Sequence, residues 1–222
     1  MVEKPVVLDA DRARVLAEFA RTCGVPFLVA HQHLFAPAYE ELRARVLEWD
    51  EFAVISAGGG LGPHRNYSAL WDYGPHDVAM FLGLTRHGRI DDDLKADRTG
   101  GAFRILLGEG RRTGFLCVWN DAAPKTRRFT VLRHPDIIVY DDRDPGGCLL
   151  RHNGRPIPVE PERPLTRAVR AFADACRGKS RDWRFDPFLG VEVTRILAQA
   201  EVRTEQTDGE DDHDRSYRHH HG

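Results

Sequence analysis

The chain has 222 residues, of which 41% are hydrophobic and 30% are charged, a mixture typical of a globular protein. Its 32 basic and 34 acidic side chains leave a formal net charge of -2. This balance provides no long-range field to attract nucleic acid or anionic lipid, so we expect neither nucleic-acid nor membrane partners.

The cysteines and the N-terminus indicate a cytoplasmic protein. The four cysteines lie far apart and show none of the close spacing that zinc sites or small disulfide scaffolds use. Met1 to Pro5 reaches an acidic residue and a proline almost at once, without the apolar stretch of a secretion signal. We therefore expect reduced thiols and no export.

The first elements resemble half of a parallel-sheet unit. Residues 9–23 predict a helix, with acidic side chains at its positive end and an apolar stripe formed by Ala13, Leu16, Phe19, Ala20 and Cys23. Gly24 ends this helix, and the apolar run 25–30 predicts a strand that is buried on both faces. The strands that should flank such a unit would have to precede Met1, so the chain is expected to begin inside a larger fold.

Helices are also predicted in the next part of the chain. Pro37 begins a helix that places Tyr39, Leu42, Val46 and Trp49 at helical spacing. The glycine-rich run 58–62 predicts a flexible loop, and residues 69–84 predict a helix that Gly74-Pro75 interrupts or kinks.

The periodicity changes at about Gly101. From 103 to 159 short β-type runs alternate with hairpin signals such as Asn153-Gly154, which predicts an antiparallel meander. Helices near 165–177 and 187–200 follow, and the acidic, histidine-ended segment 207–222 is expected to be a disordered tail. The predicted class is α+β, with a largely antiparallel open sheet backed by helices on one face.

Three segments together resemble the Gfo/Idh/MocA oxidoreductases. Glu3-Lys4-Pro5 is similar to the family's "EKP" segment, 30–38 to its "GHN.RF.PA" junction, and 70–77 to its "D.G.HD" helix. Their order and spacing make the resemblance specific. It implies three parts: 1–35 as the remnant of a Rossmann-type nucleotide-binding domain, 36–206 as a substrate-binding and oligomerisation domain, and the tail.

The resemblance also implies a catalytic set. Lys4 would polarise the substrate oxygen, His76 would act as general acid/base, and Asp72, four residues earlier, would orient the imidazole from the same helix face. A lysine and a histidine suit alcohol oxidation, because this reaction needs a cation and a base at the carbinol. A satisfied buried Asp/His pair is the structural alternative.

The remaining candidate residues would bind the cofactor or the substrate rather than take part in the reaction. The cofactor side would comprise Glu3, Lys4, Pro5, His31 and Gln32, and the substrate side Asp72 and His76, with His64 and Arg65 either touching hydroxyls or serving as plain loop polarity. Leu34 stands where the family commonly has an arginine, which places an anionic contact there in doubt. His31 and His33 would point to opposite sides of a continuing strand, so we expect no metal site.

The glycine turn of a dinucleotide-binding domain does not occur in these 222 residues. The chain is therefore expected to be a fragment, an alternative start or a split form of a dehydrogenase that transfers hydride between NAD or NADP and a sugar or polyol. Its own dinucleotide binding should be weak or absent. The alternatives are a non-catalytic module that forms homo-oligomers through the open sheet and, more remotely, a metal-dependent hydrolase using His31, His33, His64 and His76.

Overall fold

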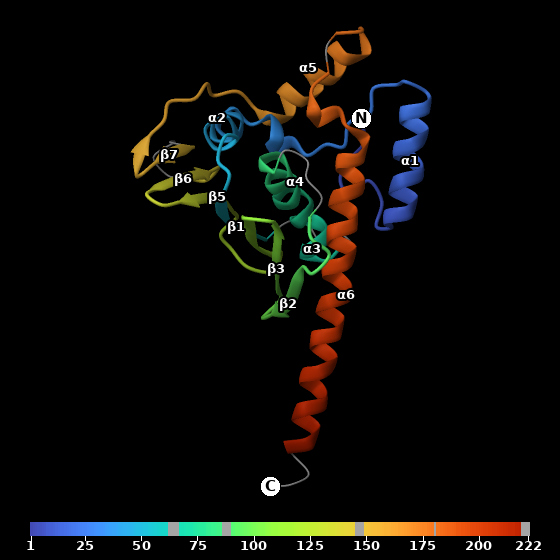
Figure 1. Ribbon diagram of the computed structural model, residues 1–222, viewed down its shortest axis with the longest axis vertical. Helices are drawn as coiled ribbons and strands as arrows, with labels where there is room; N and C mark the ends of the chain where they lie inside the picture. Colours follow the sequence, from blue (N-terminus) through green and yellow to red (C-terminus); the bar gives the residue numbers. More distant parts are fainter. Residues whose placement is uncertain (62–66, 86–89, 145–148, 180, 219–222) are drawn as a thin grey trace.

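The computed structural model describes the chain except for residues 62–66, 86–89, 145–148, 180 and 219–222 (Figure 1). An eight-stranded sheet, in the order β2-β3-β4-β1-β5-β6-β7-β8, forms its centre. The strands are β1 (Phe52–Gly59), β2 (Lys95–Thr99), β3 (Ala102–Glu109), β4 (Arg112–Trp119), β5 (Thr126–Arg133), β6 (Asp136–Asp141), β7 (Leu150–His152) and β8 (Arg155–Pro156). The predicted α+β class is confirmed.

The helices match the predicted order. They are α1 (Ala10–Thr22), α2 (Pro37–Val46), α3 (Ala69–Asp72), α4 (Gly74–Leu84), α5 (Pro164–Cys176) and α6 (Pro187–Arg218), with 3-10 turns η1 (Gln32–Phe35) and η2 (Trp183–Phe185). The predicted interruption occurs next to Gly74-Pro75: α3 ends before Tyr73, and Gly74 and Pro75 begin α4. No helix within the described residues is long and apolar enough to cross a membrane.

The centre of the sheet differs from the predicted meander. β1 lies between β4, with which it is parallel, and β5, with which it is antiparallel, so the hairpins of β2 to β4 and β5 to β8 flank it. We expected Gly58 and Gly59 to belong to a flexible loop, and this prediction was wrong. Both glycines end β1 because the strand passes very close to other groups: a Cβ atom at Gly59 would lie 2.4 Å from the Trp119 carbonyl oxygen.

One face of the sheet is covered and the other is open. Along β1, the side chains of Phe52, Val54 and Ser56 are buried, whereas Ile55 is 50% exposed. Helices α2, α3 and α4 contact the strands. Figure 1 shows how these elements are arranged around the sheet. This alternation is typical of a sheet with helices on one face.

The N-terminal elements lie outside this sheet. Asp9 caps α1 by accepting a hydrogen bond from the Arg12 backbone. The predicted stripe on α1 is only partly correct: Ala13, Ala17 and Ala20 are buried against α6, whereas Phe19 is 67% exposed. The small alanine side chains allow the two helices to approach closely.

The predicted strand at 25–30 is reduced to a single parallel bridge between Val2 and Val29. Leu28, Val29 and Ala30 are buried, but Val25 is 49% exposed. A full strand would need further paired neighbours, and the described residues supply only the segment around Val2.

Helix α6 continues well beyond the predicted end near Ala200. It ends at Arg218, so helix also occupies most of the segment that we expected to be a disordered tail. Its first part packs on α1, α4 and β2, and once a helix is nucleated, adding residues costs little where no proline interrupts it.

A buried polar cluster joins helix α4 to the sheet. Asp77, which is fully buried, accepts hydrogen bonds from Arg127 Nη1 at 2.8 Å and from the Ser56 hydroxyl. Gly58 leaves room for this pair, because a Cβ atom there would lie 2.7 Å from the Asp77 carboxylate. The last residue of the "D.G.HD" segment therefore connects α4 with β1 and β5.

Removing Asp77 should destabilise the fold strongly. Asp77→Ala leaves Arg127 charged and buried without its partner, and breaking a buried ion pair in this way costs about 3–5 kcal/mol. Urea unfolding would measure the loss, with the exposed Asp93→Ala as the matched control. A loss below about 1 kcal/mol would show that the pair is not structural.

Candidate active site

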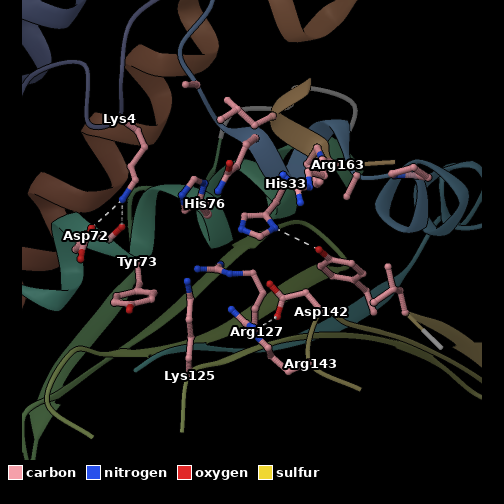
Figure 2. A pocket seen from close by; sticks show the side chains of 18 of the residues that line it. Lys4, His33, Asp72, Tyr73, His76, Lys125, Arg127, Asp142, Arg143 and Arg163 are labelled. Carbon is pink, nitrogen blue, oxygen red and sulfur yellow. Dashed lines mark hydrogen bonds and ion pairs between the residues drawn. The ribbon is translucent and has the colours of Figure 1, made fainter. Parts of the chain in front are cut away.

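An open cavity of about 690 Å³ lies on the covered face of the sheet, where the N-terminal segment, η1, α3, α4 and α5 meet β5 and β6 (Figure 2). Its lining is rich in charged and aromatic side chains. Among them are Glu3, Lys4, Gln32, His33, Asp72, Tyr73, His76, Lys125, Arg127, Tyr140, Asp142, Arg143, Glu162 and Arg163.

Lys4 reaches into this cavity from the N-terminal segment. Its ammonium donates to the Asp72 carboxylate at 2.9 Å and also to the Asp72 backbone carbonyl. The side chain of Lys4 is only 8% exposed. This contact fixes Lys4 at the end of α3.

Asp72 does not act on His76 as the sequence suggested. The two residues are four positions apart, but the break at Tyr73-Gly74 places Asp72 in α3 and His76 in α4. Asp72 bonds Lys4, and His76 Nδ1 is buried without a hydrogen-bond partner in the part of the chain described. Asp72 therefore positions the lysine rather than the imidazole.

Three histidines gather at the inner side of the cavity. After Ala30 the chain turns into η1 instead of continuing as a strand, so the prediction that His31 and His33 point to opposite sides was wrong. Their ring centroids lie 6.3 Å and 4.9 Å, respectively, from that of His76. His33 Nδ1 also lies 3.2 Å from the Tyr140 hydroxyl.

Burial keeps these imidazoles neutral. It lowers the pKa of His33 and of His76 well below the usual value, and Arg127 and Lys4 lower both further. Burial and the charge of Lys4 lower the pKa of His31 to about 3. Across the described residues no group of three His, Cys, Asp or Glu side chains has the geometry to hold a metal ion.

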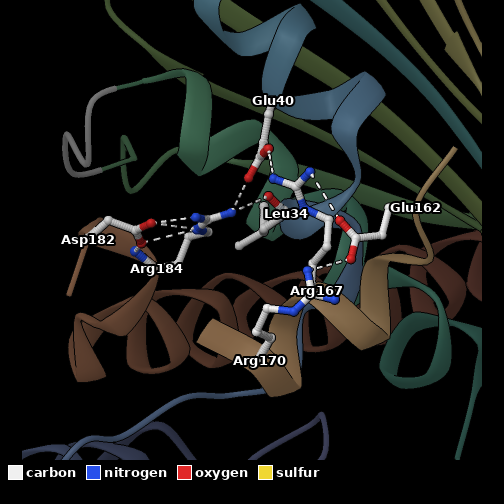
Figure 3. Close-up of polar contacts among 7 residues, drawn as sticks. All are labelled: Leu34, Glu40, Glu162, Arg167, Arg170, Asp182 and Arg184. Atoms are coloured by element: carbon white, nitrogen blue, oxygen red, sulfur yellow. Dashed lines mark hydrogen bonds and ion pairs between the residues drawn. The ribbon is translucent and has the colours of Figure 1, made fainter. Parts of the chain in front are cut away.

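A network of ion pairs holds the elements that surround the cavity (Figure 3). Glu40 of α2 accepts from Arg184 at 2.5 Å and from Arg167 of α5. Arg184 also donates to the Leu34 carbonyl and lies 4.1 Å above the Phe35 ring. The network therefore fixes η1, which carries Gln32 and His33, against α2 and α5.

The structure brings together most of the predicted residues. Lys4, Gln32, Asp72 and His76 line one cavity with Glu3, whereas Pro5 and His31 lie outside its lining. His64 and Arg65 fall outside the described residues. The sequence suggested His33 only as a ligand in the hydrolase alternative, and it did not single out the residues Tyr140, Lys125, Arg127, Asp142 and Arg143. The only sequence features that pointed to these residues were the basic run 125–128 and the alternation along the strands. Neither feature shows which strand residues face the cavity.

The depressed pKa of His31 predicts a loss of stability in acid. Its folded pKa of about 3 lies below the unfolded value of 6.5, so the unfolded state binds the proton first. Stability is full above pH 6.5 and falls below it, by up to about 1.4 kcal/mol per pH unit for this one group. Chemical unfolding between pH 7.5 and 5 should show a slope that is smaller by about that amount in His31→Gln; equal slopes would contradict the assignment.

No family model and no curated protein sequence matches the chain, but solved structures do. A protein from Magnetospirillum magnetotacticum MS-1 assigned as an oxidoreductase is 31% identical, with a TM-score of 0.78, over 89% of this chain and 71% of that one.

Two more distant structures share the fold. UDP-N-acetylglucosamine 3-dehydrogenase GnnA from Acidithiobacillus ferrooxidans is 18% identical with a TM-score of 0.81, over 93% of this chain and 70% of that one. An inositol dehydrogenase homolog from Azotobacter vinelandii, complexed with NADH and myo-inositol, is 17% identical with a TM-score of 0.75, over 92% and 69%. The neighbours are oxidoreductases of the Gfo/Idh/MocA type.

Proposed function

This chain belongs to the Gfo/Idh/MocA-type oxidoreductases, and we propose that its cavity is the substrate side of an active site that transfers hydride between NAD(P) and a sugar or polyol. The observation that carries the proposal is the meeting of Lys4 and His76 in one cavity. A cation and a neutral imidazole there supply the two functions that alcohol oxidation needs from a protein.

Lys4 is the group that stabilises the reacting oxygen. Its contact with Asp72 removes most of the freedom of the side chain, so the ammonium is held in place before substrate arrives. In the direction of oxidation it would stabilise the developing alkoxide, and in reduction it would polarise the carbonyl.

His76 is the group that moves the proton. Because burial and the neighbouring cations lower its pKa, the imidazole is neutral near pH 7, which is the protonation state that can accept the hydroxyl proton. In reduction the same residue returns that proton. Its neighbour His33, which contacts Tyr140, packs against the ring of His76.

The residues fit only one end of the cofactor. The nicotinamide ring, when bound, accepts or supplies the hydride, and we propose that Lys4, Gln32 and the buried His31 lie on its side of the site, with Glu3 and Pro5 beside them. The 222 residues contain no Gly-x-Gly-x-x-Gly turn of the kind that holds the pyrophosphate.

Replacing His76 should reduce turnover without weakening the binding of the cofactor. In a protein that joins this chain to a nucleotide-binding domain, His76→Ala should lower kcat about 10² to 10⁴ fold, the usual contribution of a general acid/base. Dinucleotide affinity should stay nearly unchanged. His134→Ala, in the exposed turn between β5 and β6, is the matched control. Unchanged turnover in His76→Ala would refute the assignment.

A second function rests on the open face of the sheet. Phe115 lies opposite both Ile55 and Leu106 in the strand register, and the three side chains are exposed by 40%, 50% and 46%. Such a continuous apolar row is typical of an interface. We propose that two copies of the chain pair through this face, which would make it a homo-oligomer.

Placing a charge in this row should separate the copies. Phe115→Arg introduces like charges at a face that would meet itself across a twofold axis. Sedimentation should show a smaller species than the wild type, whereas Val15→Arg on the exposed side of α1 should leave the mass unchanged. A wild-type monomer at micromolar concentration would contradict this proposal.

A further inference from the structure

The sheet forms one wall of the cavity, and this wall carries several positively charged side chains. Lys125 directly precedes β5, Arg127 lies within β5, and Arg143 follows β6; these three residues are called the basic wall here. Figure 2 shows them together on the sheet side, below His33 and around Asp142. They come from two neighbouring strands, so the fold itself brings them together.

Of the three cations of the basic wall, two have a carboxylate nearby. Asp77 neutralises Arg127 at 2.8 Å from beneath, and Asp142 lies 3.8 Å from Arg143 Nε. Lys125 has no carboxylate partner within ion-pair distance among the residues that the structure describes. Arg163, at the start of α5, adds another cation to the lining.

The backbone holds Lys125 in place although its side chain is exposed. Gly60 has a φ angle of +147°, and a Cβ atom there would lie 2.6 Å from the Cα of Lys125. The Tyr73 hydroxyl donates to the Gly60 carbonyl, which fixes this crossing from the other side. The close approach of Gly60, just after β1, therefore fixes the position of the Lys125 backbone.

The neighbouring imidazole responds to this field. After burial, the main causes that lower the pKa of His33 are the charges of Arg127, Lys125, Lys4 and Arg143. Four cations therefore act on the imidazole in this part of the cavity. A ligand that placed a negative group here would gain charge-assisted hydrogen bonds that a neutral polyol cannot make.

Building on the proposed function, we propose that the substrate is an anionic sugar derivative, whose carboxylate or phosphate binds the basic wall while its carbinol faces Lys4 and His76. Lys125 and Arg143 are the specificity-determining residues, because Arg127 is already paired with Asp77. Asp142, between them, would accept a hydrogen bond from a sugar hydroxyl next to the charged group.

Calorimetry with matched probes tests this without turnover or cofactor. D-Glucitol, D-gluconate and D-glucitol 6-phosphate differ mainly in the charge at one end. One of the anionic probes should bind the wild-type chain at least about tenfold more tightly than glucitol at low ionic strength, the effect of a hydrogen bond to a charged group. The anion that is preferred distinguishes a sugar acid from a sugar phosphate.

The variants locate the effect. Lys125→Gln and Arg143→Gln should each remove most of the preference for the anion, whereas Lys95→Gln, an exposed lysine on β2, should retain it. Equal binding of all three probes, no binding of either anion, or an unchanged preference in both variants would overturn the inference. Equal binding leaves a neutral polyol substrate possible, whereas failure of hydride transfer with the anion preference intact would overturn only the proposed function.

Discussion

The buried contact between Asp77 and Arg127 is the interaction on which the site depends. Asp77 directly follows His76 in α4, and Arg127 lies in β5 beside the central strand. Their ion pair, with the Ser56 hydroxyl, sets α4 at a fixed height above the sheet. Because α4 is almost entirely apolar and buried, this polar contact defines its register where hydrophobic packing alone is less specific.

That register explains the geometry around it. With α4 fixed, His76 faces η1 and meets His33, while α3 before the break directs Asp72 toward Lys4. The same Arg127 forms the floor of the cavity, so one side chain contributes to both stability and the local field. The Glu40 network fixes the opposite wall through Arg167 and Arg184.

The sequence predicted the fold class and most helices because their signals are local. Pro37, the Gly74-Pro75 break and the alternation after Gly101 each act within a few residues. The position of β1 could not be predicted in this way. Its Gly58 and Gly59 resemble a loop, and only their contacts with Asp77 and Trp119 show why glycine is needed.

The site was predicted in part for the same reason. Lys4, Asp72 and His76 were found through short motifs, and the cavity does contain all three. The contact partner of Asp72 could not be predicted in this way, because it depends on where the helix breaks. Asp72 contacts Lys4, which is 68 positions away in the sequence, instead of His76, which is four positions away. His33, Lys125 and Arg143 reach the cavity only through the turn at η1 and the pairing of β5 with β6.

Hydride transfer itself is the most direct test of the account. In a protein that joins this chain to a nucleotide-binding domain, sugars, polyols and their acids deuterated at the carbinol carbons would be incubated with NAD or NADP. We predict that deuterium appears in the reduced nicotinamide, as measured by mass spectrometry, for at least one of these substrates. Tight dinucleotide binding without any transfer of deuterium from the whole set would contradict it.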